Sequence, residues 1–125
     1  MAVDASDVGA GSVLMQEFGD DVEHPISYFS KKFNRAHKNY SVIERELLAI
    51  ILSLLHFAVY LPPYGPVLRI YYDHHPLQFL NRLKDKNQRL TRWSLMLQEY
   101  HLDVRHIRGV DNVLADCLSR ESSEQ

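Results

Sequence analysis

The sequence has little cysteine and no apolar run long enough to cross a bilayer. Cys117 is the only cysteine among 125 residues, which excludes a disulfide framework and a cysteine-based zinc site. The longest apolar stretch, LLAIILSLLHFAVYL, is interrupted by Ser53 and His56 and is shorter than the about 20 residues of a membrane span. It also lies far from the N-terminus, where a signal peptide would stand. These absences predict a soluble domain and are compatible with a reducing, intracellular compartment.

A large excess of charge is also absent. The formal net charge of −2 at pH 7 gives no support to a wholly basic nucleic-acid binder. Hydrophobic residues make up 46% of the chain, which is enough to build a core, and the length suggests one domain. We expect this domain to span residues 1–120, followed by a disordered tail over residues 121–125 (ESSEQ).

Short alternating segments at the start of the chain predict an antiparallel meander. Residues 2–6, 11–18 and 24–33 have the pattern of strands. They are separated by a break at DVGAG and by a hairpin turn signal, GDD, at residues 19–21. On the third strand, Ile26, Tyr28 and Ser30 should share one face.

The chain then changes to helical periodicity. Ser41 and Glu44 form a capping-box pattern, S-x-x-E, at the start of a helix that stops before Pro62. Its apolar residues recur at helical spacing and are Ile43, Leu47, Ile50, Ile51, Leu54 and Leu55. Such a broad apolar surface predicts a helix that is buried against a sheet.

Strands and helices alternate in the second half of the chain. Residues 67–73 and 101–107 have the pattern of strands, whereas residues 87–100 and 110–120 have that of helices. Trp93 falls on the apolar face of its helix and is expected in the core. The order β-β-β-α-β-α-β-α predicts an α/β fold with helices packed on a five-stranded mixed sheet, three antiparallel strands followed by parallel ones.

Four acidic residues occupy strands and helices where a solvent-facing charge is not needed. Asp4 lies in the first strand and Asp73 ends the fourth, while Glu46 and Asp116 lie on helices. If these carboxylates converged, divalent cations between them would relieve their repulsion, and oxygen ligands suit Mg²⁺. Two such ions about 3.5–4 Å apart could drive phosphodiester hydrolysis by in-line displacement. Sequence spacing alone leaves open whether the four residues converge.

Five stretches of the sequence resemble the ribonuclease H domain of gypsy-type LTR retrotransposon reverse transcriptases, in that family's order and spacing. They are VDASDVGAGSVL, PISYFSKKFNRAHKNYSVIERELLAI, YYDHHPLQFL, NQRLTRWSLMLQEYHLDVRHIRG and DNVLADCLSR. The resemblance implies a ribonuclease H-like fold and cleavage of the RNA strand of RNA–DNA hybrids. It also implies that two Mg²⁺ ions, or Mn²⁺ in their place, bind to four catalytic acids: Asp4, Glu46, Asp73 and Asp116. An upstream polymerase domain of the same polyprotein is the implied partner.

Two local ambiguities bear on these ligands. The capping box accounts for Glu44, so Glu46, which directly precedes LLA as the family's ligand does, is the expected metal ligand. In YYDHHPLQFL, strand alternation turns His74 away from the Asp73 side, and the resemblance implies a minor-groove contact for His75. Asp-His-His phosphoesterases share the spelling DHH, but the further Asp-rich motifs of those enzymes are absent from the sequence.

Two basic runs, KKFNRAHK and RLKDKNQRLTR, could follow a phosphate backbone or form solvated faces. The candidate nucleic-acid contacts are Ser6, His75, Lys84, Lys86, Arg89 and Asn112. A rival function is that of a host-adopted module which keeps the fold to bind nucleic acid or protein without catalysis. In an active element, the resemblance implies a cytoplasmic location or a virus-like particle.

Overall fold

Three antiparallel strands open the chain, as predicted. The computed structural model describes residues 1–17, 23–61, 68–72, 87–100 and 102–106. The meander consists of β1 (Ala2–Ala5), β2 (Gly9–Glu17) and β3 (Glu23–Lys32). β2 begins at Gly9, earlier than predicted, because Ser6 closes a tight turn. The Ser6 N–H donates to the Gly9 carbonyl at 2.9 Å, and the Ser6 hydroxyl accepts from the amides of Val8 and Gly9 at 3.3 and 3.2 Å.

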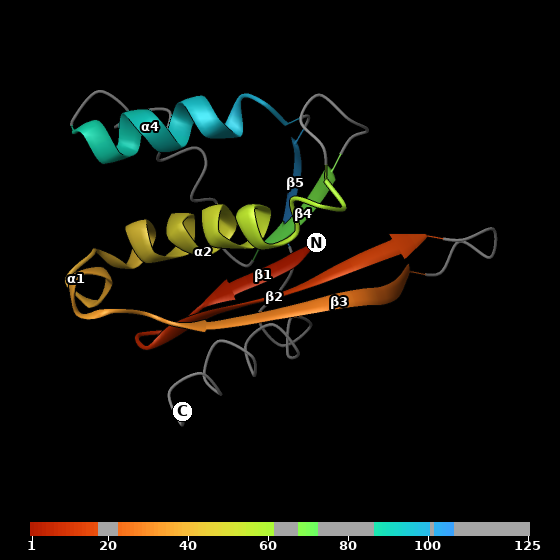
Figure 1. Cartoon of the computed structure of the whole chain (residues 1–125), viewed down its shortest axis with the longest axis horizontal. Coiled ribbons are helices and arrows are strands. Elements are labelled where there is room, and N and C mark those ends of the chain that lie inside the picture. Colours follow the sequence, from red (N-terminus) through yellow and green to blue (C-terminus); the bar gives the residue numbers. More distant parts are fainter. Residues whose placement is uncertain (18–22, 62–67, 73–86, 101, 107–125) are drawn as a thin grey trace.

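Two parallel strands complete the sheet. β4 (Leu68–Tyr72) pairs with β1, and β5 (Leu102–His106) pairs with β4, which gives the order β3-β2-β1-β4-β5 (Figure 1). The register sets Ala2 opposite Tyr71, and the Tyr71 N–H donates to the Met1 carbonyl at 2.9 Å. The predicted five-stranded mixed sheet is therefore confirmed, and β1 lies at its centre with one antiparallel and one parallel neighbour.

The central helix, α2 (Val42–His56), begins with the predicted capping box. The Ser41 hydroxyl accepts from the Glu44 N–H at 3.2 Å, and the Ser41 N–H donates to the Glu44 carboxylate at 3.4 Å. The helix stops before Pro62, as predicted. Its last residue is His56, and the fully buried Phe57 is its C-cap. One expected face residue is corrected, since Leu55 is 55% exposed near this end.

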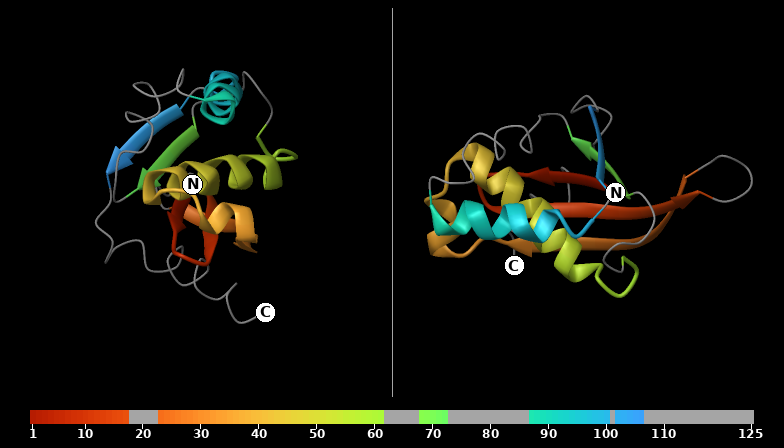
Figure 2. Two further views of the ribbon diagram at one scale, coloured as in Figure 1. Left: turned by 90° about the vertical axis from the view of Figure 1, so that its left-hand side faces the viewer. Right: turned by 90° about the horizontal axis from the view of Figure 1, so that it is seen from above.

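Two further helices pack near the start of α2. The sequence did not predict α1 (Arg35–Lys38), a single turn whose N-cap Asn34 accepts from the His37 N–H at 2.8 Å. The predicted helix α4 (Gln88–Leu97) is capped by Asn87 and buries Leu90, Trp93 and Leu97. Both α2 and α4 lie on the same side of the sheet (Figures 1 and 2). The core therefore forms between that side of the sheet and these two helices.

The opposite side of β3 is more exposed. Ile26 and Tyr28 share a face, as predicted, and are 40% and 51% exposed. In the part of the chain that the structure describes, no helix is long and apolar enough to cross a membrane. The predicted hairpin turn at residues 19–21, the last helix over residues 110–120 and the tail over residues 121–125 lie outside the described residues.

Candidate active site

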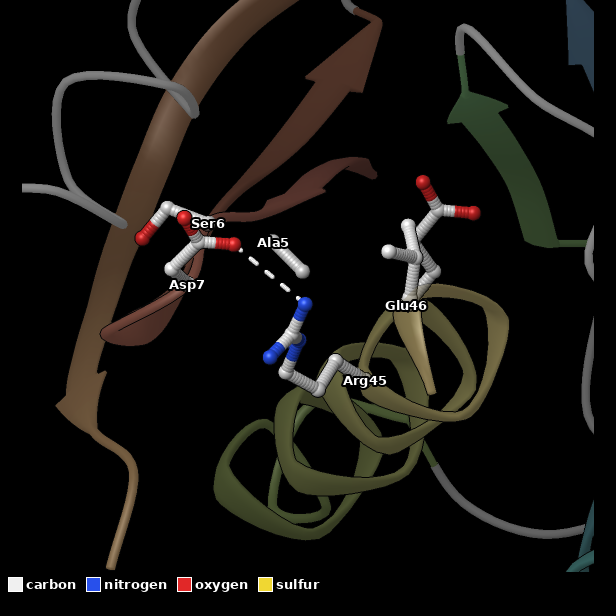
Figure 3. Close-up of a pocket in the computed structure, with 6 residues that line it drawn as sticks. Ala5, Ser6, Asp7, Arg45 and Glu46 are labelled. Atoms are coloured by element: carbon white, nitrogen blue, oxygen red, sulfur yellow. Dashed lines mark hydrogen bonds and ion pairs between the residues drawn. The ribbon is translucent and has the colours of Figure 1, made fainter. Parts of the chain in front are cut away.

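Among the acidic residues that the structure describes, Glu46 is the most deeply buried. It lies in the second turn of α2, beside the sheet, and only 6% of it is exposed. It lines a cavity of about 150 Å³ with Ala5, Ser6, Asp7, Val42 and Arg45. The Glu46 carboxylate points away from Arg45, whose guanidinium points toward Asp7 (Figure 3). A buried carboxylate is costly unless it is hydrogen-bonded, protonated or bound to a cation.

Asp4 lies on β1. It is half-buried and directly precedes Ala5, which lines the cavity with Glu46. Asp73 follows the last residue of β4 in sequence, and Asp73 and Asp116 lie outside the described residues. Two of the four predicted ligands are therefore described. Among the residues that the structure describes, no three or more His, Cys, Asp or Glu side chains form a group that could hold a metal ion.

Arg45 supplies the positive charge of the cavity. Its Nη2 donates to the Asp7 carboxylate at 3.3 Å, and its Nη1 donates to the Lys38 carbonyl at 3.3 Å. The Arg45 side chain is only 15% exposed, whereas that of Asp7 is 92% exposed. The sequence analysis did not single out Arg45. The available signal was its place between Glu44 and Glu46, where one basic residue separates two acids.

Glu44 faces a different environment, although it is only two residues from Glu46. It forms an ion pair with Arg89 of α4, and the Glu44 side chain is 19% exposed. Burial alone would raise the pKa of the Glu44 carboxyl, but hydrogen bonds from Arg89 and Ser41 outweigh it and hold the pKa below its ordinary value. Glu44 therefore joins α2 to α4 in addition to capping α2.

Aromatic rings lie beside the Arg89 end of this ion pair. The Arg89 guanidinium carbon lies 4.0 Å from the centroid of the Tyr40 ring and 5.8 Å from that of Trp93. The Tyr40 ring also contacts Trp93 at 6.1 Å and His37 at 5.4 Å between centroids. Burial, followed by the nearby charges of Lys31 and Arg89, lowers the pKa of His37. We call Glu44, Arg89, His37, Tyr40 and Trp93 the docking cluster.

Two of the candidate nucleic-acid contacts are described, and both have structural partners. The Ser6 hydroxyl closes the β1–β2 turn, and Arg89 belongs to the docking cluster. Their contact with nucleic acid stays a prediction. The other candidates, His75, Lys84, Lys86 and Asn112, lie outside the described residues. Trp93 is 9% exposed, as expected of a core residue.

Comparison with known proteins identifies the family. The family described as "RNase H-like domain found in reverse transcriptase" matches residues 1–100. The chain belongs to this family. Its curated relatives include the Transposon Tf2-3 and Tf2-4 polyproteins of Schizosaccharomyces pombe, each 41% identical over 122 residues. The match covers 96% of this RNase H-like domain but only 9% of the length of those polyproteins.

A solved structure supports the same fold assignment. RNase H1 of the halophilic archaeon Halobacterium salinarum matches with a TM-score of 0.65, over 99% of this chain and 98% of that one. The two sequences are only 16% identical, so the match supports the fold alone. The predicted ribonuclease H-like fold is therefore confirmed.

Proposed function

We propose that this RNase H-like domain hydrolyses the RNA strand of RNA–DNA hybrids, using divalent cations. The observation that carries the proposal is the burial of Glu46 at a cavity beside the C-terminal end of β1. In open α/β sheets, ligands gather at the carboxyl ends of parallel strands, and β1 and β4 are parallel neighbours. The family match provides the chemical context for this acid.

The proposed metal ligands are Asp4, Glu46, Asp73 and Asp116. Asp4 stands near the end of β1, and Asp73 follows Tyr72, the last residue of the parallel neighbour β4. The donor set fits the proposed ions, because carboxylate oxygens are the ligands that Mg²⁺ and Mn²⁺ prefer. We propose two Mg²⁺ ions, with Mn²⁺ as a substitute.

Bound divalent cations would supply Lewis-acid stabilisation of charge on the scissile phosphate and activation of the attacking water. The task of the protein is to hold the carboxylates in place before substrate arrives. The α2 backbone provides this rigidity for Glu46, because the helix is capped at Ser41 and its residues Leu47, Ile50 and Leu54 are fully buried.

The substrate proposal rests on the general properties of such duplexes. The wide, shallow minor groove of an RNA-containing helix displays 2′-hydroxyl groups, which distinguish RNA from DNA without reading base sequence. We propose that the domain works within a gypsy-type element, attached to an upstream polymerase domain, in the cytoplasm or a virus-like particle. The share of the polyprotein relatives that it covers supports this arrangement.

The test is a cleavage assay with the 125-residue chain. Labelled RNA–DNA hybrid, RNA duplex and DNA duplex are each incubated with Mg²⁺, Mn²⁺, Ca²⁺ or EDTA. We expect RNA-strand cleavage of the hybrid with Mg²⁺ or Mn²⁺ and none with EDTA. Hybrid binding without cleavage in any metal would reject the enzymatic proposal in favour of a host-adopted binding module.

A further inference from the structure

The cavity at the start of α2 carries opposite charges on two sides. Glu46 lies on one side, with its carboxylate pointing away from Arg45, and the Arg45 guanidinium lies on the other (Figure 3). Its volume of about 150 Å³ is well above the roughly 15 Å³ that one water needs. It can therefore admit a group larger than water. On the Arg45 side the guanidinium pairs with Asp7, which also lines the cavity, so a negatively charged group would bind there by taking the place of Asp7.

Arg45 is held in place by the fold but only weakly neutralised. Its Nη1 donates to the Lys38 carbonyl, which fixes the plane of the guanidinium without consuming its charge. Its ion-pair partner Asp7 is 92% exposed on the β1–β2 turn, so solvent screens that pair strongly. Replacing Asp7 by another anion would therefore cost little.

Arg89 provides a contrast within the same molecule. Its partner Glu44 is only 19% exposed, and the Arg89 guanidinium also lies over the Tyr40 ring. That charge is neutralised and stacked as part of the contact between α2 and α4. Of these two arginines, Arg45 is therefore the better suited to an exchangeable anion.

We propose that Arg45 binds a backbone phosphate of the nucleic-acid duplex and exchanges Asp7 for it when substrate arrives. This inference rests on the proposed function and deepens it, because it assigns a substrate-binding residue beside the proposed ligand Glu46. A planar guanidinium fits two non-bridging phosphate oxygens, and the contact is a charge-assisted pair. Arg45 then positions the duplex against the carboxylate side of the cavity.

Binding is measured by fluorescence anisotropy with a labelled RNA–DNA hybrid in Ca²⁺ and in EDTA, across a salt titration. Arg45→Gln should weaken binding about tenfold. It should also make the slope of log K against log salt shallower by about 0.9, the value of one phosphate contact. Arg45→Lys should recover the salt slope but only part of the affinity, because lysine keeps the positive charge but lacks the two parallel N–H donors of the guanidinium.

Arg69→Gln is the matched control. It removes the same charge and also an ion pair to an aspartate, since Arg69 lies 4.0 Å from Asp103 on the neighbouring strand. Its affinity and salt slope should stay near those of the wild type. Equal losses in Arg45→Gln and Arg69→Gln would overturn the proposal by showing a general charge effect.

Asp7→Asn tests the exchange itself. Asp7→Asn alone should tighten hybrid binding. Most of that gain in affinity should disappear when Arg45→Gln is also present, because the two side chains are coupled through one ion pair. The same gain in both backgrounds would contradict the exchange. Wild-type cleavage with an unchanged Arg45→Gln affinity would reject this inference and leave the proposed function standing. Arg45-dependent binding without cleavage would support this inference and reject the proposed function.

Discussion

Glu44 and Glu46 lie only two residues apart on α2, but the surroundings of their side chains differ. Glu44 pairs with Arg89 and forms the capping box with Ser41, and the Arg89 guanidinium lies over the Tyr40 ring. Glu46 is more deeply buried and lines a cavity that it shares with Arg45. The docking cluster resembles a stabilising contact, whereas the cavity resembles a site prepared for a ligand.

This difference shows that the surroundings of a charge matter more than its place in the sequence. Arg89 and Arg45 both pair with an acid, but Glu44 is mostly buried and Asp7 is almost fully exposed. A partly buried pair is hard to separate, because each charge would lose its compensation. An exposed pair exchanges easily. The comparison therefore favours a stabilising role for the docking cluster, and it is consistent with the substrate binding that we propose for the cavity.

The largest expected effect on stability is at Trp93. Trp93→Ala should lower the free energy of unfolding by about 3–5 kcal/mol, because it leaves a void among the residues that join α4 to α2. The measurement is urea unfolding followed by circular dichroism. Leu95→Ala on the same helix is the control, since Leu95 is 60% exposed and should change stability far less. Similar losses in both variants would show that α4 contributes as a whole and not through the docking cluster.

Arg89 should follow with a smaller loss. Arg89→Gln should lower the free energy of unfolding by about 2–3 kcal/mol, because Glu44 loses its ion pair and Tyr40 its stacked cation. The exposed Arg92 offers a charge-matched control, and Arg92→Gln should stay within about 0.5 kcal/mol of the wild type. If the Arg89→Gln protein were as stable as the Arg92→Gln protein, the ion pair and stacking of Arg89 would not stabilise the fold, and the contrast between Arg89 and Arg45 would fail.

Glu44 should give the smallest of the three losses. Glu44→Gln should lower the free energy of unfolding by about 1–2 kcal/mol, since the amide still accepts hydrogen bonds but no longer carries charge. Glu99→Gln, which changes an exposed acid after α4, is the control. The capping box alone would account for only a few tenths of a kcal/mol, so a loss of that size would mean that the ion pair contributes nothing.

The same pair sets a pH dependence. The pKa of Glu44 is lower in the folded chain than its ordinary value of 4.5, so the folded state favours the ionised carboxyl. The stability gained is fully present above pH 4.5 and is lost as the pH falls through the folded-state pKa. The stability difference between wild type and Glu44→Gln should therefore shrink below pH 4.5. A constant difference between pH 7 and pH 3 would contradict the assignment.

Local signals in the sequence predicted much of the fold. The alternation of β2 and β3, the capping box at Ser41 and the apolar face of α2 each depend on residues a few positions apart. Helix ends were predicted less sharply, because Pro62 set only an outer limit for α2, whereas the helix ends at His56, where Phe57 enters the core. α1 is a single turn, too short to show a periodic pattern.

The contacts between distant parts of the chain could not be predicted in this way. Arg89 and Glu44 are 45 residues apart, and Arg45 and Asp7 are 38 apart. No local pattern connects such pairs, so the sequence assigned Arg89 to a basic run and passed over Arg45. Choosing Glu46 over Glu44 depended on the capping box and the family resemblance, and the burial of Glu46 agrees with that choice without testing its role.

The central claim is that Glu46 is needed for cleavage, as a proposed metal ligand, whereas Glu44 stabilises the fold. The most direct measurement compares Mg²⁺-dependent cleavage of an RNA–DNA hybrid by wild type, Glu46→Gln and Glu44→Gln, each shown to be folded by circular dichroism. We predict that Glu46→Gln loses more than about 100-fold in rate, since losing a direct ligand should exceed the loss of an outer-shell partner. Glu44→Gln should cleave at the wild-type rate. A folded Glu46→Gln protein that cleaves normally, or a folded Glu44→Gln protein that does not, would contradict the account.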